Sequence, residues 1–177
     1  MRSPVLYIFA GLPGVGKSTL AQRLAGEFGC VYVRIDTIEQ ALRELCSVSV
    51  EAEGYQLAYR MASDNLRVGV SVVADSCNPI EMTRQEWEDL ARRAGADFQN
   101  IEVFCSDAAE HQRRVETRAS TVPGLRLPTW TDVKHRGYET WTRDRITIDT
   151  FGKSVAGSFE ELREKLSRQK HQPLQPL

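Results

Sequence analysis

Short apolar runs alternate with amphipathic stretches along the chain. The apolar runs are rich in β-branched and aromatic residues, and they lie at residues 5–10, 30–35, 70–74, 101–105 and 145–150. Between them, apolar residues recur every three or four positions, which is the period of a helix. These helical stretches lie near residues 17–28, 36–45, 51–68, 79–94, 107–118, 129–141 and 158–170. The alternation predicts an α/β domain with a mostly parallel sheet and helices on both faces.

Several helix ends carry capping signals. Asp36 follows the second apolar run, and Glu39 three residues later completes a capping-box pattern, so Asp36 is expected to cap the next helix. Asn78 and Pro79 are expected to open the fourth helical stretch. Ser158 is expected to cap the last helix in the same way as Asp36.

A glycine-rich stretch at residues 11–19 gives the clearest chemical signal. It follows a strand and opens a helix, in the order that a phosphate-binding loop (P-loop) requires. Its glycines allow backbone N–H groups to approach phosphate oxygens, while the helix N-terminus adds a positive dipole. Lys17 would hold the outer phosphates and Ser18 would bind magnesium. The predicted nucleotide-binding residues here are Gly11, Leu12, Pro13, Gly14, Val15, Gly16, Lys17, Ser18 and Thr19. The alternative is an ordinary glycine-rich turn.

Two carboxylates are candidates for chemistry, because ligands of parallel sheets bind beyond the carboxyl ends of the strands. Asp36 could orient or deprotonate an attacking hydroxyl, or it could act as a helix cap only. Asp75 ends the third apolar run and could organise magnesium, or it could cap the following helix.

Arg114 and Arg118 are four residues apart, so they project from one helix face towards a loop with Pro123 and Gly124. We expect this segment, residues 119–137, to be a lid. Arginines ahead of a mobile loop could neutralise charge on a transferring phosphoryl group. The alternative is a solvated arginine face. Arg126 is a weaker third candidate.

Other conspicuous side chains are given structural roles. Trp130 and Trp141 are expected to be packing residues, with a substrate contact as the alternative. His111 and His135 are expected at the surface.

Composition limits the partners and the location. The chain has 177 residues and a formal net charge of −1, so it has no broad positive field for duplex nucleic acid or an anionic membrane. It has no apolar stretch of membrane-spanning length and no signal-peptide pattern, and we expect a cytoplasmic location.

The cysteines are far apart and are expected to be buried free thiols: Cys30, Cys46, Cys77 and Cys105. One domain over residues 1–170 is expected, with residues 171–177 as a frayed tail.

The motifs at Gly11–Thr19, Arg34–Ile38, Val72–Pro79, Arg114 and Arg118 resemble a known family. This is the small kinase-like, AAA-type branch of the P-loop proteins, which includes the kinase domain of polynucleotide kinase, chloramphenicol phosphotransferase, adenylylsulfate kinase and gluconate kinase. The resemblance implies a three-layer P-loop NTPase fold with a five-stranded parallel sheet in the order 2-3-1-4-5 and a lid. It also implies magnesium ATP as donor.

The resemblance also assigns roles to individual residues. It implies that Asp36 is the acceptor-activating base and that Arg114 and Arg118 are lid arginines. The loop from Thr150 to Lys153 would border the adenine, which makes Lys153 a predicted nucleotide-binding residue.

The predicted function is transfer of the γ-phosphate of ATP, with Mg²⁺, to a hydroxyl of a small-molecule acceptor. Substitution of Lys17 or Asp36 is expected to abolish turnover with little loss of folding. The sequence differs from polynucleotide kinase at Glu39 and from adenylylsulfate kinase at Ile35, so neither acceptor is assigned. The alternatives are a nucleic-acid 5′-hydroxyl kinase, a regulatory ATPase or nucleotide switch, and a toxin-type kinase of an activated sugar. The oligomeric state is left open.

Overall fold

In a computed structural model, which describes residues 3–169, five parallel strands form one sheet in the order β2-β3-β1-β4-β5. The strands are β1 (Val5–Ala10), β2 (Val31–Arg34), β3 (Val72–Asp75), β4 (Asp97–Phe104) and β5 (Ile146–Asp149). Every pairing in the sheet is parallel. The predicted fold and strand order are therefore confirmed.

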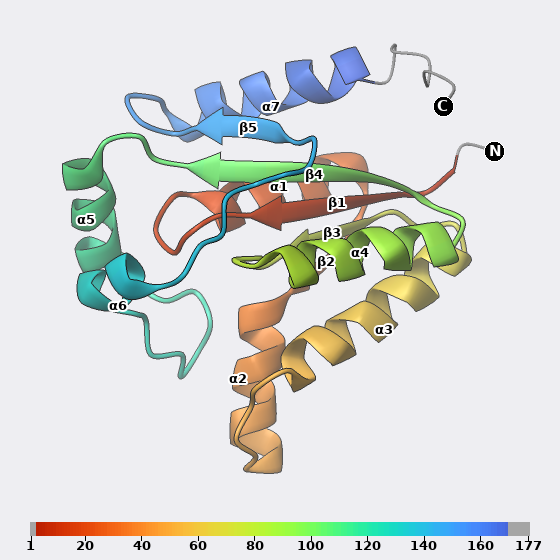
Figure 1. Ribbon diagram of the computed structural model, residues 1–177, viewed down its shortest axis with the longest axis horizontal. Helices are drawn as coiled ribbons and strands as arrows, with labels where there is room; N and C mark the ends of the chain where they lie inside the picture. The colour runs from red at the N-terminus through yellow and green to blue at the C-terminus, as the bar shows by residue number, and fades with distance from the viewer. Residues whose placement is uncertain (1–2, 170–177) are drawn as a thin grey trace.

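Helices cover both faces of this sheet (Figure 1). The helices are α1 (Lys17–Phe28), α2 (Ile35–Cys46), α3 (Glu53–Arg67), α4 (Glu81–Arg93), α5 (Ala108–Thr117), α6 (Trp130–His135) and α7 (Val155–Gln169). Helices α1 and α7 lie on one face, and α3 and α4 lie on the other. The result is three layers with an apolar core on each side of the sheet.

The central strand β1 shows why the apolar runs are continuous rather than alternating. Tyr7 and Phe9 belong to the core under α1 and α7, whereas Leu6 and Ile8 belong to the core under α3 and α4. A strand that is covered on both faces needs apolar side chains at successive positions. The position of β1 at the centre places the loop that follows it at the middle of the sheet edge.

Helices α5 and α6 lie beyond the carboxyl ends of β1 and β4, whereas α2 projects away from the sheet (Figure 1). The segment between α5 and α6 runs between these two parts of the molecule. The sheet edge with the P-loop is thus flanked by α2 on one side and by α5 and α6 on the other.

The predicted capping role of Asp36 is wrong. Helix α2 begins at Ile35, directly after β2, and its N-cap is Arg34, which makes no side-chain capping bond. The carboxylate of Glu39 accepts a hydrogen bond from Arg43 Nη2 at 3.0 Å instead of closing a capping box. Because buried Ile35 starts the helix, Asp36 lies inside the first turn.

The last helix also begins earlier than predicted. Helix α7 starts at Val155, and Ser154 Oγ accepts a hydrogen bond from the Gly157 N–H at 3.1 Å. Ser158, which was expected to cap the helix, is buried within it.

Three other boundaries differ from the predictions. Strand β4 starts at Asp97 rather than at residue 101, and α6 ends at His135 rather than near Trp141. Helix α4 starts at Glu81 rather than at residue 79, because Asn78 adopts a left-handed φ of 43°. The Asn78 amide donates to the carbonyl of Phe9 on β1 at 2.8 Å.

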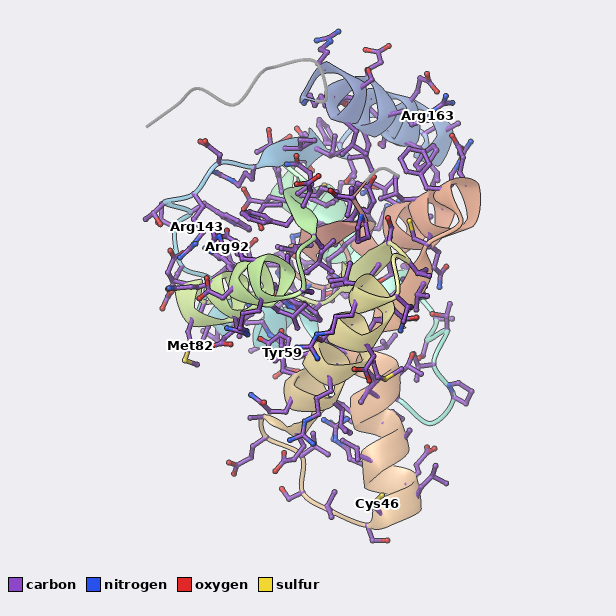
Figure 2. The ribbon with its side chains drawn as sticks, turned by 90° about the vertical axis from the view of Figure 1, so that its right-hand side faces the viewer. Cys46, Tyr59, Met82, Arg92, Arg143 and Arg163 are labelled. Carbon is purple, nitrogen blue, oxygen red and sulfur yellow. The ribbon has the colours of Figure 1, made fainter. Side chains whose placement is uncertain are left out.

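The four cysteines were predicted to be buried, but Cys30, Cys77 and Cys105 are partly exposed and Cys46 is exposed. Cys46 is exposed at the end of α2, where it is labelled in Figure 2. Residues 3–169 contain no helix that is long and apolar enough to cross a membrane. The predicted tail at residues 171–177 and the domain end at residue 170 lie outside the described residues.

Candidate active site

The P-loop contains glycines at positions that no other residue could occupy without rearrangement. Gly11 and Gly14 have φ values of 141° and 88°, which side chains disfavour. A Cβ atom on Gly11 would lie 2.1 Å from the carbonyl oxygen of Val103, and one on Gly14 would lie 2.5 Å from a methyl of Val115. The loop therefore packs directly against β4 and α5.

Two side chains from distant parts of the chain form hydrogen bonds with backbone carbonyl oxygens of the P-loop. His111 Nε2 lies 2.8 Å from the carbonyl oxygen of Pro13, and Thr150 Oγ1 donates to the carbonyl oxygen of Val15 at 2.9 Å. His111 is buried and makes an edge-to-face contact with Trp130, so its predicted surface position is wrong. These two side chains therefore hold the P-loop in place.

The loop leads directly into the N-terminus of α1. Gly16 is the N-cap without a capping side chain, and the first turn of α1 contains no acidic residue. The positive end of the helix dipole is therefore not neutralised by the protein, which is the arrangement that binds phosphate.

Lys17 and Asp75 form a buried ion pair below the loop. Lys17 Nζ lies 2.6 Å from Asp75 Oδ1, and the Tyr32 hydroxyl donates to Asp75 Oδ2 at 2.5 Å. Burial alone would raise the pKa of Asp75, but Lys17 outweighs it with help from Tyr32 and Ser18, and the pKa lies below its ordinary value. Burial opposes the charge on Lys17 too, yet Asp75 raises the Lys17 pKa. Both groups are therefore charged at neutral pH.

Asp36 is connected to this pair through Arg34, and its side chain is half-exposed. Its carboxylate lies 3.6 Å from Arg34 Nη2, and Arg34 Nε lies 3.9 Å from Asp75. Arg34 thus lies between a buried carboxylate and an accessible one.

Arg114 is held in a fixed orientation at the nucleotide side. Its guanidinium donates to Glu110 through Nε at 2.7 Å and to the hydroxyl and carbonyl of Thr150 through Nη1 and Nη2. Hydrogen bonds from Arg113 and Arg114 lower the pKa of Glu110 to about 2. Glu110 is therefore ionised and can orient Arg114.

Arg118 differs from Arg114 because the protein gives it few partners. Its Nε atom is buried without a hydrogen bond, and within residues 3–169 it makes no ion pair. Burial lowers the pKa of Arg118, and the charges of Arg34 and Arg136 act in the same direction, while Asp36 opposes them. A nearby anion would relieve this repulsion.

These groups surround a cleft of about 840 Å³, which is in the upper range for small-molecule sites. Most predicted site residues line it: Leu12, Pro13, Gly14, Gly16, Lys17, Ser18, Thr19, Asp36, Arg114 and Arg118. Gly11, Val15, Asp75 and Lys153 do not line it. Val15 and Asp75 are buried behind the lining, and Lys153 Nζ pairs with Glu161 at 2.6 Å.

The predicted lid segment contributes much of the other wall. Thr121, Gly124, Arg126 and Arg136 are among its lining residues. The hydroxyl of Thr121 accepts a hydrogen bond from Arg34 Nη1 at 2.7 Å, which joins the lid to the end of β2.

The oxygen donors at the bottom of the cleft are suitable for magnesium. Ser18 lines the cleft, and its hydroxyl is near enough to Asp75 to help lower the pKa of that carboxyl. Residues 3–169 contain no cluster of three or more His, Cys, Asp or Glu side chains that could hold a metal alone. Magnesium would therefore depend on phosphate oxygens and water as well as on Ser18, which is how it is usually bound.

Sequence reasoning missed three contributors to this site. Tyr32, His111 and Arg136 reach the cleft or its supports from elements that are distant in the chain. No local motif marks them, because their partners are known only once the sheet has formed.

Solved structures with the same fold include several small kinases. A "putative kinase" of Chloroflexus aurantiacus J-10-fl is 21% identical with a TM-score of 0.72, and the match covers 95% of this chain and 98% of that one. The APS kinase CysC of Mycobacterium tuberculosis, in complex with AMPPNP and APS, is 17% identical with a TM-score of 0.69 over 94% and 99%. A gluconokinase of Sinorhizobium meliloti 1021 is 16% identical with a TM-score of 0.63 over 97% and 100%.

Sequence comparison adds a short match and a family. A "putative adenylate kinase" of Pyrococcus furiosus is 37% identical over 57 residues, which is 31% of this chain and only 32% of that protein's length. The model of the AAA domain family matches residues 6–133, which is most of the chain and includes the P-loop, Asp36 and both lid arginines. The chain therefore belongs to the AAA domain family and has the fold of the small P-loop kinases.

Proposed function

We propose that the protein transfers the γ-phosphate of ATP to a hydroxyl group of a small molecule. The observation that carries the proposal is that one cleft is lined by Lys17 of the P-loop, by Asp36 and by Arg118. Phosphoryl transfer needs these three kinds of group together: a cation for the donor, a carboxylate for the acceptor and charge for the transition state.

The P-loop would hold the donor. Its backbone amides and Lys17 would contact the outer phosphates at the N-terminus of α1. Ser18 would bind Mg²⁺, which supplies positive charge to the phosphate oxygens. Asp75 lies behind the cleft lining, near Ser18 and paired with Lys17, so it would help to orient these two groups.

Asp36 would act on the acceptor. It would accept the hydroxyl proton as the acceptor oxygen bonds to the γ-phosphorus and the bond to the β–γ bridging oxygen breaks, which leaves ADP. Arg114 and Arg118 would neutralise charge on the phosphoryl group during transfer, and the lid would exclude water. Since such a transition state is loose, positioning and charge would supply most of the rate.

The names of the structural relatives favour transfer over simple hydrolysis. They include an APS kinase and a gluconokinase, whose acceptors are small molecules.

A screen with γ-labelled ATP and a panel of hydroxylated metabolites tests the proposal. We expect label in one chemical class of metabolite and none with Asp36→Asn. Preferential labelling of a 5′-hydroxyl oligonucleotide would instead indicate a nucleic-acid kinase. Slow loss of ATP without any labelled acceptor would indicate a regulatory ATPase.

Three further predictions stay open to test. Lys153 is still predicted to border the adenine, although its ammonium pairs with Glu161 in the structure. A cytoplasmic location and dependence on Mg²⁺ are predicted as well.

A further inference from the structure

The cleft is positively charged although the whole chain has a formal net charge of −1. Among the described residues, seven basic and three acidic side chains line it. The basic residues are Lys17, Arg34, Arg43, Arg114, Arg118, Arg126 and Arg136, and the acidic ones are Asp36, Glu39 and Asp132. Two of these positive charges are paired with carboxylates behind the lining, Lys17 with Asp75 and Arg114 with Glu110. The remaining excess favours anionic ligands.

All three acidic residues already have partners. Glu39 forms an ion pair with Arg43 at 3.0 Å, and Asp132 closes the capping box of α6 with Thr129. Asp36 pairs with Arg34 at 3.6 Å, and Asp132 is near enough to Arg126 and Arg136 for their charges to lower its pKa.

Three of the cleft arginines meet around Asp36 from three different elements. Arg34 ends β2, Arg118 follows α5 and Arg136 follows α6. Arg34 Nη2 lies 3.6 Å from Asp36, and Arg136 Nη1 lies 3.4 Å from the sulfur of Cys77. Arg118 is close enough to both Arg34 and Arg136 for their charges to disfavour its own. The carboxylates that pair with these guanidinium groups are Asp36 and the buried Asp75, both through Arg34, and Asp75 also pairs with Lys17. The three guanidinium groups therefore keep an excess of positive charge.

Unused donors accompany this excess charge. The Nε atoms of Arg34 and Arg118 are buried without hydrogen bonds, and within residues 3–169 neither Arg118 nor Arg136 makes an ion pair. Buried donors without partners are costly, and guanidinium groups bind carboxylate, phosphate and sulfate through paired hydrogen bonds. These arginines are therefore arranged for an oxyanion.

The positively charged side chains lie at two different ends of the cleft, one for each proposed substrate. Lys17 belongs to the P-loop, and Arg114 bonds to Thr150, which also supports that loop, so both lie at the donor end. Arg34 and Arg136 lie beside Asp36 and Cys77, on the α2 side. The lid encloses this end, because Gly124 packs so closely on α2 that its Cβ would lie 2.1 Å from Glu44 Oε1.

We propose that the acceptor carries an anionic group, namely a carboxylate, phosphate or sulfate, besides the hydroxyl that it presents to Asp36, and that Arg34 and Arg136 bind this group. This inference rests on the proposed function, and it excludes neutral sugars and cationic alcohols as preferred acceptors.

Matched pairs of acceptors test the proposal. D-glycerate and glycerol 3-phosphate are compared with glycerol, and adenosine 5′-phosphosulfate is compared with adenosine, so that carboxylate is distinguished from phosphate and sulfate. We expect the anionic member of at least one pair to have a kcat/KM at least about tenfold higher than its neutral counterpart. Arg136→Gln should raise the KM for that anion about tenfold to a hundredfold, and Arg136→Lys should restore part of the loss. Equal or better use of the neutral members would overturn the proposal.

Arg163→Gln is the matched control. Arg163 lies on α7, on the opposite face of the sheet from α3 and α4 (Figure 2), and pairs with Glu27 and Glu160. Its substitution removes one surface guanidinium and should leave the acceptor KM unchanged.

A binding measurement separates this inference from the proposed function. Protein saturated with Mg²⁺ and AMPPNP is titrated calorimetrically with inorganic phosphate, inorganic sulfate and acetate. We expect saturable binding of at least one anion to the wild type and to Arg163→Gln, with a loss of about tenfold or more in Arg136→Gln. Absence of anion binding to the wild type, or loss of AMPPNP binding itself in Arg136→Gln, would contradict the proposal. Anion binding without transfer to any acceptor would support the anion site and contradict the proposed function.

Discussion

Arginine occurs in two opposite settings in this protein. Arg84 on α4 is fully buried, yet its Nε and Nη2 atoms donate to the carbonyl oxygens of Asn78, Pro79 and Glu139 at 2.9 to 3.1 Å. Its guanidinium also lies 4.2 Å from the ring centre of Trp141, while Nη1 makes no hydrogen bond. Arg118 and Arg136, which line the cleft, have fewer protein partners than Arg84.

This difference indicates which arginines serve folding and which serve a ligand. Arg84 joins the β3–α4 loop to the segment after α6, so its partners are other parts of the same chain. Within residues 3–169, Arg118 makes no ion pair, and Arg136 donates to the sulfur of Cys77 but makes no ion pair either, so their charges would be satisfied by a substrate. Substitutions in the two settings should therefore be separable, with loss of stability at Arg84 and loss of activity in the cleft.

Lys17→Met should have the largest effect, because Lys17 serves both folding, through its ion pair with Asp75, and ligand binding, through the P-loop. We expect kcat to fall about a thousandfold, since a cation that holds the transferring phosphate is lost. Against the expectation from sequence alone, folding should also suffer, by about 3–5 kcal/mol, because Asp75 would remain charged and buried without its partner. Kinetic assays and urea unfolding measure the two losses.

The double variant Lys17→Met/Asp75→Asn is the control for this interpretation. It should recover most of the unfolding free energy but none of the activity. Equal instability of the single and double variants would show that the ion pair is not the cause.

Asp36→Asn should lower kcat about a hundredfold or more with little change in stability. The carboxylate is half-exposed and does not cap α2, so folding does not depend on it. The measurement is single-turnover transfer to the acceptor found in the screen, with AMPPNP binding as a test of site integrity. Near-normal transfer would mean that Asp36 is not the base.

Arg84→Met should produce the reverse pattern. We expect the unfolding free energy to fall by about 3 kcal/mol, because three buried carbonyl groups lose their donor. Nucleotide binding at low temperature should be retained. Arg93→Met, on the exposed side of the same helix, should cost little. Similar losses for both variants would mean that Arg84 has no special structural role.

The smallest expected effect is the dependence of the unfolding free energy on pH. Because the pKa of Asp75 in the folded protein is lower than its ordinary value of 3.8, its contribution to stability is present above pH 3.8 and is lost as the pH falls through the folded pKa. The pKa of Lys17 is raised above 10.5, so its contribution is complete below that pH and is lost above the folded pKa. Unfolding titrations should show an acid decline in the wild type that is shallower in Asp75→Asn. Identical declines would exclude Asp75 as its source.

The parts of the fold that could be predicted are those with a local signal. The apolar runs at residues 5–10 and 145–150 contain strands β1 and β5, and the loop that follows β1 has glycines that meet β4 and α5. Helix boundaries were less predictable. Asp36 and Glu39 match a capping box in sequence, but the chain passes from β2 into α2 without a linker, so the carboxylates are used elsewhere.

The candidate site was predicted only in part for the same reason. Lys17, Asp36, Arg114 and Arg118 have sequence signals, and all four line one cleft. Arg136 has no such signal, because its contact with Cys77 joins residues that are 59 positions apart.

By itself, the sequence determined the alternation of strands and helices, the P-loop and the identity of its principal cation, since each depends on neighbours within a few residues. Tertiary structure alone decided that Lys17 pairs with Asp75, that Tyr32 donates to the same carboxylate, and that His111 supports Pro13. It also decided that Arg34, Arg118 and Arg136 line the same cleft. The physical reason is that charge balance and burial depend on which distant segments meet in space.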